Sequence, residues 1–511
     1  MSIFSQIQGP RRGSVFIALG TTLLTVFFAI WIGYDLASRG SKDHSTRTSI
    51  RIGLLGHPSD LNIFQVRDVN AHRVLSAGHL GLVRVNHSGV IRAGAAERWV
   101  VDKLKNQVIF YLRRDLYFYD GTQFHCDHVI DSFHRAFKSK KSNIETFEAA
   151  CASASKLIIS NFWSLSALFN TLALTEYSIV LNPWEDKNQI QRGLGPYQLT
   201  TVNEKGYFFL RRTNHPLSRD EDPEEIRFFV FNSEKDLHAA FLAGEIDITQ
   251  ISLGGGVPSA LTSSLRVSSL VDRRWQISIG DRGLDKANYR CLKKKIDRSS
   301  IVEILNRKGV NSFLPAYGLT PPGQIGYWFP SARDRTSKCE ISFNDKTSIK
   351  AGPIPIIYLM ESSPPHVNSV IESTLNALGF DVKMVPVPRS DFVDKIFSRD
   401  YHLALFSYGI PRIPELNVIG LYSSDKSIPL VPDEQLLPFE EVVDLIKDDL
   451  TAYRIAAIEE QMWKNSDYIP LVFERAAYLI SSCIELPHYN QFSPIINFID
   501  IRLRQNCLKK N

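Results

Sequence analysis

Short apolar runs alternate with amphipathic stretches along most of the chain, most clearly in its last third. The runs 354–359, 381–385 and 402–406 have the length of buried strands. Between them, 365–378 and 391–397 carry apolar residues at helical spacing. Strands that alternate with helices in this way favour a mostly parallel sheet covered by helices.

The earlier part of the chain repeats this alternation in similar short units. Ser233 is placed to cap a helix over 233–243 and Gly244 to end it, and Gly379 has the same place after 365–378. The other predicted elements are strands at 50–55, 108–113, 208–210 and 227–231, a helix running into a strand over 72–85, and an amphipathic helix over 127–137.

One apolar run, 14–34, is much longer than these and contains no ionisable side chain. At about 1.5 Å per residue it would span roughly 30 Å as a helix, enough to cross the hydrocarbon core of a membrane. Arg11 and Arg12 precede it and favour a cytoplasmic amino terminus. We therefore expect a single-pass protein of the cytoplasmic membrane, with its large domain on the periplasmic side. A cleaved signal peptide is the alternative, although the run is long for one and 35–40 offers a poor cleavage site.

The composition is that of a globular protein, with 44% hydrophobic and 22% charged residues among 511. This length predicts two or three lobes. A net charge of +5 is mild and gives no reason to propose nucleic-acid binding. The six cysteines form no CxxC pair, and their disulfide pairing stays open. They lie at 126, 151, 291, 339, 483 and 507.

Several short motifs occur in a fixed order over nearly the whole part after residue 48. They include FYLRRDLYFYDGTQF at 110–124, GLGPY at 193–197 and AFLAGEID at 240–247. In these motifs the chain resembles the bacterial extracellular solute-binding proteins of family 5, which include oligopeptide-, dipeptide- and nickel-binding proteins. The other matching segments are 50–60, 81–85, 94–99, 295–298, 321–323 and 468–471.

This resemblance implies a two-lobed α/β fold of the periplasmic-binding-protein type II kind with an extra subdomain, preceded here by one transmembrane helix. It implies that a small solute, peptide-like or other, is captured between the lobes and delivered to an ABC permease, without enzymatic activity or a cofactor. The expected organisation is a cytoplasmic tail (1–13), the membrane helix (14–34), a linker (35–48), a first lobe (49–270) with an inserted subdomain (83–187), a second lobe (271–465), and a return to the first lobe (466–511).

Two departures from the family pattern bear on the ligand. Peptide-binding members carry an acidic residue for the peptide amino group after the late strand, whereas 406–415 contains no Asp and only Glu415 as a carboxylate. The segment 289–298 has lysines where the family usually has small apolar residues. The usual amine contact is therefore in doubt and a different ligand is possible. A membrane-anchored accessory or signalling protein that kept the fold but lost transport is the alternative.

Ligand pockets are commonly lined by aromatic side chains with a few polar anchors. By position in the resemblance, the ligand is expected near the 57–64 loop and at five further residues. The alternative for each aromatic residue is ordinary core packing. The predicted residues are Phe64, Tyr197, Trp275, Ser407, Tyr408 and Phe473.

Two motifs could carry other chemistry. His125, Asp127 and His128, with Asp131 on the same helix face, have the residue types of a zinc or nickel site. The start of a helix, with Asp127 near its amino end, explains them better, so no metal site is predicted. The S-x-x-K pattern at 153–156 lacks the partner motifs of a serine acylase, so a hydrolase is the least favoured class.

Overall fold

The computed structural model describes residues 48–504 with internal gaps, together with residue 507. Residues 1–47 therefore lie outside the described part, and with them the predicted membrane segment 14–34. None of the helices in the described residues is long and apolar enough to span a membrane. The gaps are 59–60, 65, 67–68, 87–89, 140–146, 163–164, 182–191, 252–257, 284–285, 307–311, 323, 325–326, 332–352, 361–362, 411–450, 466–467 and 486–500.

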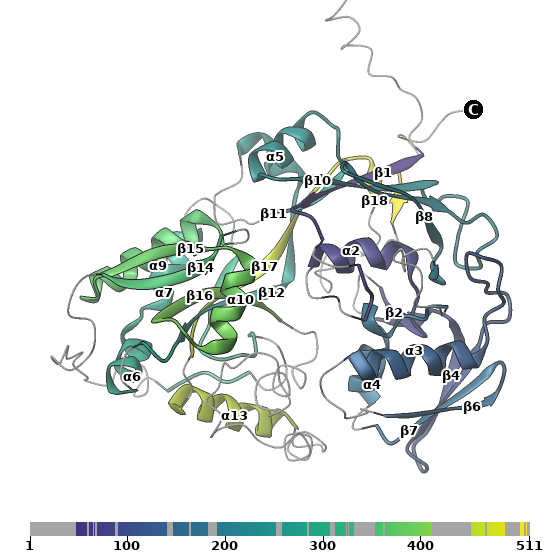
Figure 1. Cartoon of the computed structure of the whole chain (residues 1–511), viewed down its shortest axis with the longest axis horizontal. Coiled ribbons are helices and arrows are strands. Elements are labelled where there is room, and N and C mark those ends of the chain that lie inside the picture. The colour runs from purple at the N-terminus through teal and green to yellow at the C-terminus, as the bar shows by residue number, and fades with distance from the viewer. Residues whose placement is uncertain are drawn as a thin grey trace, which may run out of the picture. The chain divides into compact units, whose positions relative to one another are not determined.

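A sheet of 11 strands organises most of the described residues, in the order β15-β14-β16-β12-β17-β11-β1-β10-β9-β8, with β13 paired to β17 beside this path. Long strands β12 and β17 lie in the middle of it (Figure 1). The strands are β1 (Ser49–Leu55), β8 (Tyr197–Asn203), β9 (Gly206–Arg211), β10 (Glu225–Phe231), β11 (Ile248–Ile251), β12 (Leu265–Ile279), β13 (Phe313–Pro315), β14 (Ile354–Leu359), β15 (Val382–Val387), β16 (Leu403–Gly409) and β17 (Tyr468–Ile480).

The expectation of a mostly parallel sheet is wrong, because the sheet is mixed. Strand β1 pairs in parallel with β10 and β11, and β14 with β15 and β16, as strand–helix–strand units require. The pairs that join these units are antiparallel, since β17 runs against both β11 and β12, and β12 runs against β16. Strands β8 and β9 add an antiparallel hairpin at one edge.

A separate four-stranded sheet has the order β4-β5-β7-β6. Its strands are β4 (Ala96–Asp102), β5 (Gln107–Leu112), β6 (Glu148–Ser153) and β7 (Lys156–Ser160). Two short antiparallel pairs complete the strands, namely β2 (Val83–Val85) with β3 (Ile91–Ala93) and β18 (Ile484–Glu485) with β19 (Arg502–Leu503).

Helices cover both faces of the β15-β14-β16 segment, as Figure 1 shows for α9 and α10. Helix α9 packs Val367, Ile371 and Leu375 on one face, and α10 packs Phe392 and Ile396 on the other. The helices are α2 (Val69–Gly78), α3 (Cys126–Ser139), α4 (Leu165–Leu172), α5 (Glu234–Leu242), α6 (Lys286–Lys295), α7 (Arg298–Asn306), α9 (Pro365–Ala377), α10 (Arg389–Ser398) and α13 (Thr451–Asn465), with the 3₁₀ turns η1 (Thr175–Tyr177) and η3 (Ser259–Ser264).

The predicted strands and helices that fall within the described residues are confirmed to within a few residues at each boundary. The predicted helix caps are confirmed as well. The side chain of Ser233 accepts a hydrogen bond from the Asp236 backbone N–H at the start of α5. Gly244 and Gly379 follow α5 and α9 with φ of 71° and 91°, the left-handed conformation that ends a helix at little cost for glycine.

Several family motifs have structural roles in this fold. Asp120 Oδ1 accepts a hydrogen bond from Thr122 N at 2.9 Å and so fixes the predicted turn. Asp247, at the end of the motif 240–247, is fully buried and accepts hydrogen bonds from Arg51 N and Nε at 3.0 and 3.1 Å. These residues hold strands and helices together, so the motifs report the fold more than the ligand.

A disulfide joins Cys126 at the start of α3 to Cys151 in β6. It closes a loop with a sequence separation of 25, for which loop entropy predicts about 3.5 kcal/mol of stabilisation. Cys126→Ser is therefore expected to lower the free energy of unfolding by about that amount, as measured by urea unfolding under oxidising conditions. The same change in a fully reduced sample should have little effect, and a large effect there would contradict a role for the disulfide. Cys291, Cys483 and Cys507 are also disulfide-bonded.

Burial lowers the pKa of His79 from 6.5 to about 4, because the ring next to α2 is cut off from water. Its Nδ1 lies 2.9 Å from the carbonyl of Leu75, to which the neutral ring donates. Below pH 6.5 the unfolded chain takes up a proton that the folded chain refuses until about pH 4. Stability must therefore fall as the pH falls, by about 2 kcal/mol at pH 5 for this one histidine.

Unfolding in urea at pH 7 and pH 5 tests this directly. The variant His79→Asn should lose a large part of the pH dependence, because it has no titrating ring. His134→Asn changes an exposed histidine of α3 and is the matched control for the loss of one histidine. Equal pH dependence in all three proteins would contradict the assignment.

Candidate functional site

Strands β12, β16 and β17 lie side by side and carry four of the residues predicted to contact a ligand. Trp275 is paired with Ser407 in the register of β12 and β16. Arg274 is paired with Tyr408 of β16 and with Phe473 of β17. Because side chains alternate along a strand, Trp275 and Ser407 face one side of the sheet, and Tyr408 and Phe473 face the other. The fold thus gathers these four residues but divides them between two faces.

Trp275 belongs to a hydrophobic core in this structure. Its side chain is buried among residues of β14, α7 and α9. Its indole Nε1 donates a hydrogen bond of 2.8 Å to Glu474 Oε2, and Arg273 Nε lies 3.7 Å from the same oxygen. This is how a buried tryptophan normally satisfies its one polar atom. The arrangement fastens β12 to β17.

The other predicted residues differ in how they could meet a ligand. Tyr197 begins β8, is buried, and donates its hydroxyl to the carbonyl of Pro223 at 3.1 Å. Phe64 is buried in the segment after β1, and Phe473 is buried against Val271, Ala316 and Ile410. Ser407 and Tyr408 are only half-buried. These two alone among the six combine a hydroxyl group with access to solvent.

Beside Tyr408 lies a group of buried polar side chains, here called the Arg274 cluster: Arg274, Gln276, Thr320 and Glu459. All four are at most 1% exposed. Arg274 donates from Nε to Gln276 Oε1 at 2.9 Å and from Nη1 to the carbonyl of Leu319 at 3.0 Å. Its guanidinium carbon lies 5.8 Å from the ring centre of Tyr408 and 5.7 Å from that of Tyr468. Aromatic faces at this distance stabilise a cation.

Glu459 projects from α13 and fixes the segment that follows β13. Its carboxylate accepts hydrogen bonds from Leu319 N at 2.6 Å, and from Thr320 N and Oγ1 at 2.7 Å each. A Cβ atom on Gly318 would lie 2.0 Å from Glu459 Oε2, so only glycine permits this approach. Burial raises the pKa of Glu459, and its hydrogen bonds and Arg274 oppose that rise.

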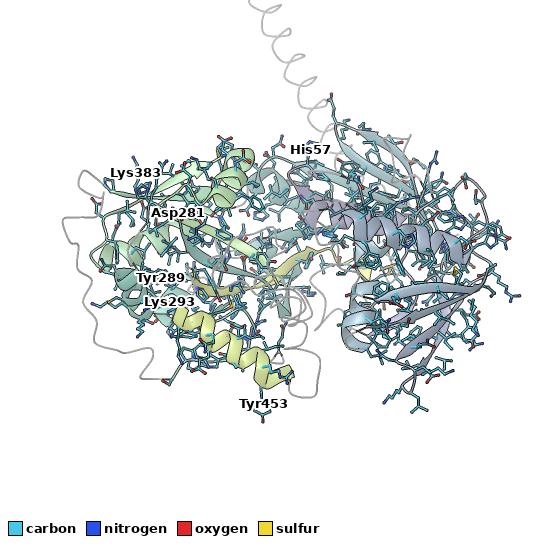
Figure 2. All side chains as sticks on the ribbon, turned by 60° about the horizontal axis from the view of Figure 1, so that its bottom comes forward. His57, Asp281, Tyr289, Lys293, Lys383 and Tyr453 are labelled. Carbon is cyan, nitrogen blue, oxygen red and sulfur yellow. A yellow bond between two sulfur atoms is a disulfide. The ribbon has the colours of Figure 1, made fainter. Side chains whose placement is uncertain are left out.

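The lysine-rich helix α6 departs from the family pattern for a structural reason. Lys293 is buried, and its Nζ donates to the carbonyl of Trp463 at 3.1 Å, in the last turn of α13. A cation at this end of a helix is favoured by the helix dipole and by the unpaired carbonyls. Figure 2 shows Lys293 beside Tyr289 on α6, close to α13, and Nζ lies 4.9 Å from the Tyr289 ring centre.

Arg298 is the second buried cation near α13. Its guanidinium donates to four backbone carbonyls, and it stacks 5.0 Å from the ring centres of Tyr317 and Trp463. Burial lowers the pKa of Arg298 to about 10, so it stays protonated at neutral pH. The acceptors are the carbonyls of Ala316, Pro470, Lys293 and Ile296, at 2.7, 2.8, 3.1 and 3.1 Å.

The Arg274 cluster was not anticipated from the sequence. A signal for it exists, because polar residues at 274, 276 and 278 alternate with apolar residues at 275, 277 and 279 in the last part of the strand. Such a pattern places them on one face of β12. Glu459 and Thr320 carry no comparable signal, since neither belongs to an alternating pattern.

The part of the chain that the structure describes contains no group of three or more His, Cys, Asp or Glu residues arranged to hold a metal ion. His128 Nδ1 accepts a hydrogen bond from the backbone N–H of His125 at 3.0 Å, at the start of α3. Burial lowers the pKa of His128, with a smaller contribution from the neighbouring His125. This pair therefore acts as part of the helix start.

Solved structures of several bacterial binding proteins have a similar architecture. It is similar to the murein tripeptide binding protein MppA of Escherichia coli, with a TM-score of 0.75 and 16% identity over 90% of this chain and 99% of MppA. It is also similar to AgaA of A. tumefaciens in complex with agropinic acid, with a TM-score of 0.71 and 18% identity over 89% of this chain and 99% of AgaA. The likeness to NikZ of Campylobacter jejuni in complex with Ni(L-His) has a TM-score of 0.69 and 14% identity over 89% of this chain and 99% of NikZ. No curated protein matches by sequence.

These likenesses show the fold, which is the α/β fold of these three binding proteins. The sequence model of the bacterial extracellular solute-binding proteins, family 5 (middle), matches residues 90–428. The chain belongs to this family.

Proposed function

We propose that the chain is an extracytoplasmic solute-binding protein that holds one small solute between two lobes and delivers it to an ABC transporter. The match of the family model to residues 90–428 carries this proposal. The likeness of the fold to MppA, AgaA and NikZ supports it. The names of these proteins refer to a tripeptide, an acid and a nickel chelate, so the fold alone does not select a ligand.

The proposed lobes are 49–270, with an inserted subdomain at 83–187, and 271–465, with 466–511 returning to the first lobe. Strand β17 pairs with β11 and with β12, and β12 pairs in turn with β16. The two long strands therefore connect the sheet segments of both proposed lobes and are the natural hinge. Closure would follow when a solute binds the closed state more tightly than the open one.

We further propose that 14–34 anchors the chain in the membrane. Anchoring would raise its effective concentration near a permease in the same membrane. After expression of the full chain, washing the membranes with alkaline carbonate should leave the protein in the membrane fraction. Its quantitative release as a shorter, cleaved chain would contradict anchoring.

The proposed function is tested by thermal unfolding of the full chain against a panel of solutes. A suitable panel is the murein tripeptide, agropinic acid, tri-alanine and Ni(L-His). A solute present at 100 times its Kd is expected to stabilise the folded state by about 2.7 kcal/mol, which gives a clear rise in Tm. No shift with any member would contradict solute binding and favour an accessory protein that has kept the fold without transport.

A further inference from the structure

Two buried hydrogen-bond donors of the Arg274 cluster have no partner among the described residues. They are Nη2 of Arg274 and Nε2 of Gln276, and both side chains are 0% exposed. A buried donor without an acceptor costs free energy that a folded protein normally avoids. Two such donors in one group therefore point to an acceptor that the described residues do not supply.

Covalent geometry places the two donors beside each other. Arg274 Nε and Nη2 are bonded to the same carbon, and Gln276 Oε1 and Nε2 share another. The hydrogen bond of 2.9 Å between Nε and Oε1 brings these two carbons together. It also sets the amide orientation, because the reversed amide would direct an N–H group at the Nε–H group. The free donors are thus neighbours on one buried face of β12.

The charge of Arg274 is not matched by a carboxylate of its own. Glu459 is the carboxylate near it, and both its oxygens are occupied by Leu319 N, Thr320 N and Thr320 Oγ1. No ion pair within 4.0 Å joins Arg274 to a carboxylate of the described residues. The ring faces of Tyr408 and Tyr468 stabilise the cation but accept none of its remaining N–H groups.

The surroundings of Arg274 indicate how a solute could reach it. Gln276, Leu319 and Tyr468 are buried, whereas Tyr408 is half-buried at the end of β16. The next residue, Gly409, is exposed, and the open space around it would admit a side chain. Tyr408, whose ring centre lies 5.8 Å from the guanidinium carbon of Arg274, is therefore the neighbour of Arg274 that reaches solvent.

We propose that Arg274 and Gln276 bind a carboxylate group of the transported solute, with one oxygen on Arg274 Nη2 and the other on Gln276 Nε2. This assignment rests on the proposed function and adds the class of the solute, an acid. A carboxylate supplies a negative charge and two acceptor oxygens, which match one cation and two free donors. It also agrees with the lack of an Asp in 406–415, because an acid recognised here needs no amine contact there.

The test is isothermal titration of the full chain with two acids and their carboxamides. Agropinic acid and tri-alanine are each compared with the amide that differs only at the carboxylate, and inorganic phosphate is titrated as a second anion. At least one acid is expected to bind about 10- to 100-fold more tightly than its amide, since a charged hydrogen-bonded group contributes about that factor. Phosphate binding alone would identify a phosphate site and overturn the carboxylate assignment.

Two variants of the site, one control and one fallback variant complete the test. Arg274→Met and Gln276→Leu should each remove most of the preference for the acid. Arg266→Met is the control, because Arg266 is an exposed residue of the same strand that donates to Ser263 O and Leu265 O. If Arg274→Met does not fold cooperatively, Arg274→Lys keeps the charge, lacks Nη2, and should still lose the preference.

The outcomes separate this proposal from the proposed function. Equal binding of acid and amide, or unchanged binding by Arg274→Met, would overturn the carboxylate site and leave solute binding intact. Failure of every probe to bind the wild-type chain would count against solute binding itself and, with it, against the site.

Discussion

Replacing Glu459 with leucine is expected to lower the free energy of unfolding by about 4 kcal/mol. The change leaves Leu319 N, Thr320 N and Thr320 Oγ1 without the carboxylate that accepts their hydrogen bonds. It also removes the carboxylate nearest to the buried charge of Arg274. The leucine avoids the cost of burying a carboxylate, so the net loss is smaller than three lost hydrogen bonds would suggest.

The neighbouring residue offers a matched control. Glu460 is on the same helix, is about half exposed, and pairs with Lys464 at 2.6 Å. Glu460→Leu should change the free energy of unfolding by less than about 0.5 kcal/mol, because exposed ion pairs contribute little. Urea unfolding of the three proteins measures both values. Equal effects of the two substitutions would show that Glu459 does not fix the segment after β13.

Arg298→Met is expected to cost a similar amount, about 4 kcal/mol. Four buried carbonyls would lose their donor, and they belong to three parts of the fold: the end of α6, the segment after β13, and β17. Methionine fills part of the volume and spares the cost of burying a charge. Neither gain supplies a new hydrogen-bond donor for the four carbonyls.

Arg290→Met provides the comparison for Arg298, since Arg290 is an exposed residue of α6. It should leave the midpoint of urea unfolding nearly unchanged. If Arg298→Met behaved like Arg290→Met, the guanidinium would not be the connection between α6 and β17 that its hydrogen bonds indicate.

Most of the fold could be predicted from the sequence because its elements are local. The strands at 50–55 and 354–359, and the helix capped by Ser233, depend on periodicity and on capping residues within a few positions. The direction of strand pairing could not be predicted this way. The antiparallel course of β12 and β17 depends on contacts between residues about 200 positions apart, which no local pattern reports.

The candidate site was harder to predict, for a related reason. Resemblance drew attention to Tyr408, which lies next to Arg274, and to Trp275, which packs in the core. Arg274 itself is one of two consecutive arginines, and only the pairing of β12 with β16 and β17 decides that it is buried while Arg273 is partly exposed. Whether a charged side chain is buried depends on the tertiary structure, so the sequence alone assigns no role to Arg274.

The lysines of α6 are a departure from the family pattern that can be explained without a ligand. By sequence alone these lysines indicate a possible change of ligand, yet Lys293 donates a hydrogen bond to the carbonyl of Trp463 in the last turn of α13. A changed motif residue can therefore reflect a new internal contact. Half of the segment 406–415, namely 411–415, lies outside the described residues, so the meaning of its missing Asp rests on binding experiments.

The most direct test of solute binding is isothermal titration of the full chain with each member of the solute panel. We expect saturable binding of at least one small solute with a stoichiometry of one, and loss of that binding in Arg274→Met if the solute is an acid. Absence of saturable binding by every solute in the panel, in a protein that unfolds cooperatively, would contradict it.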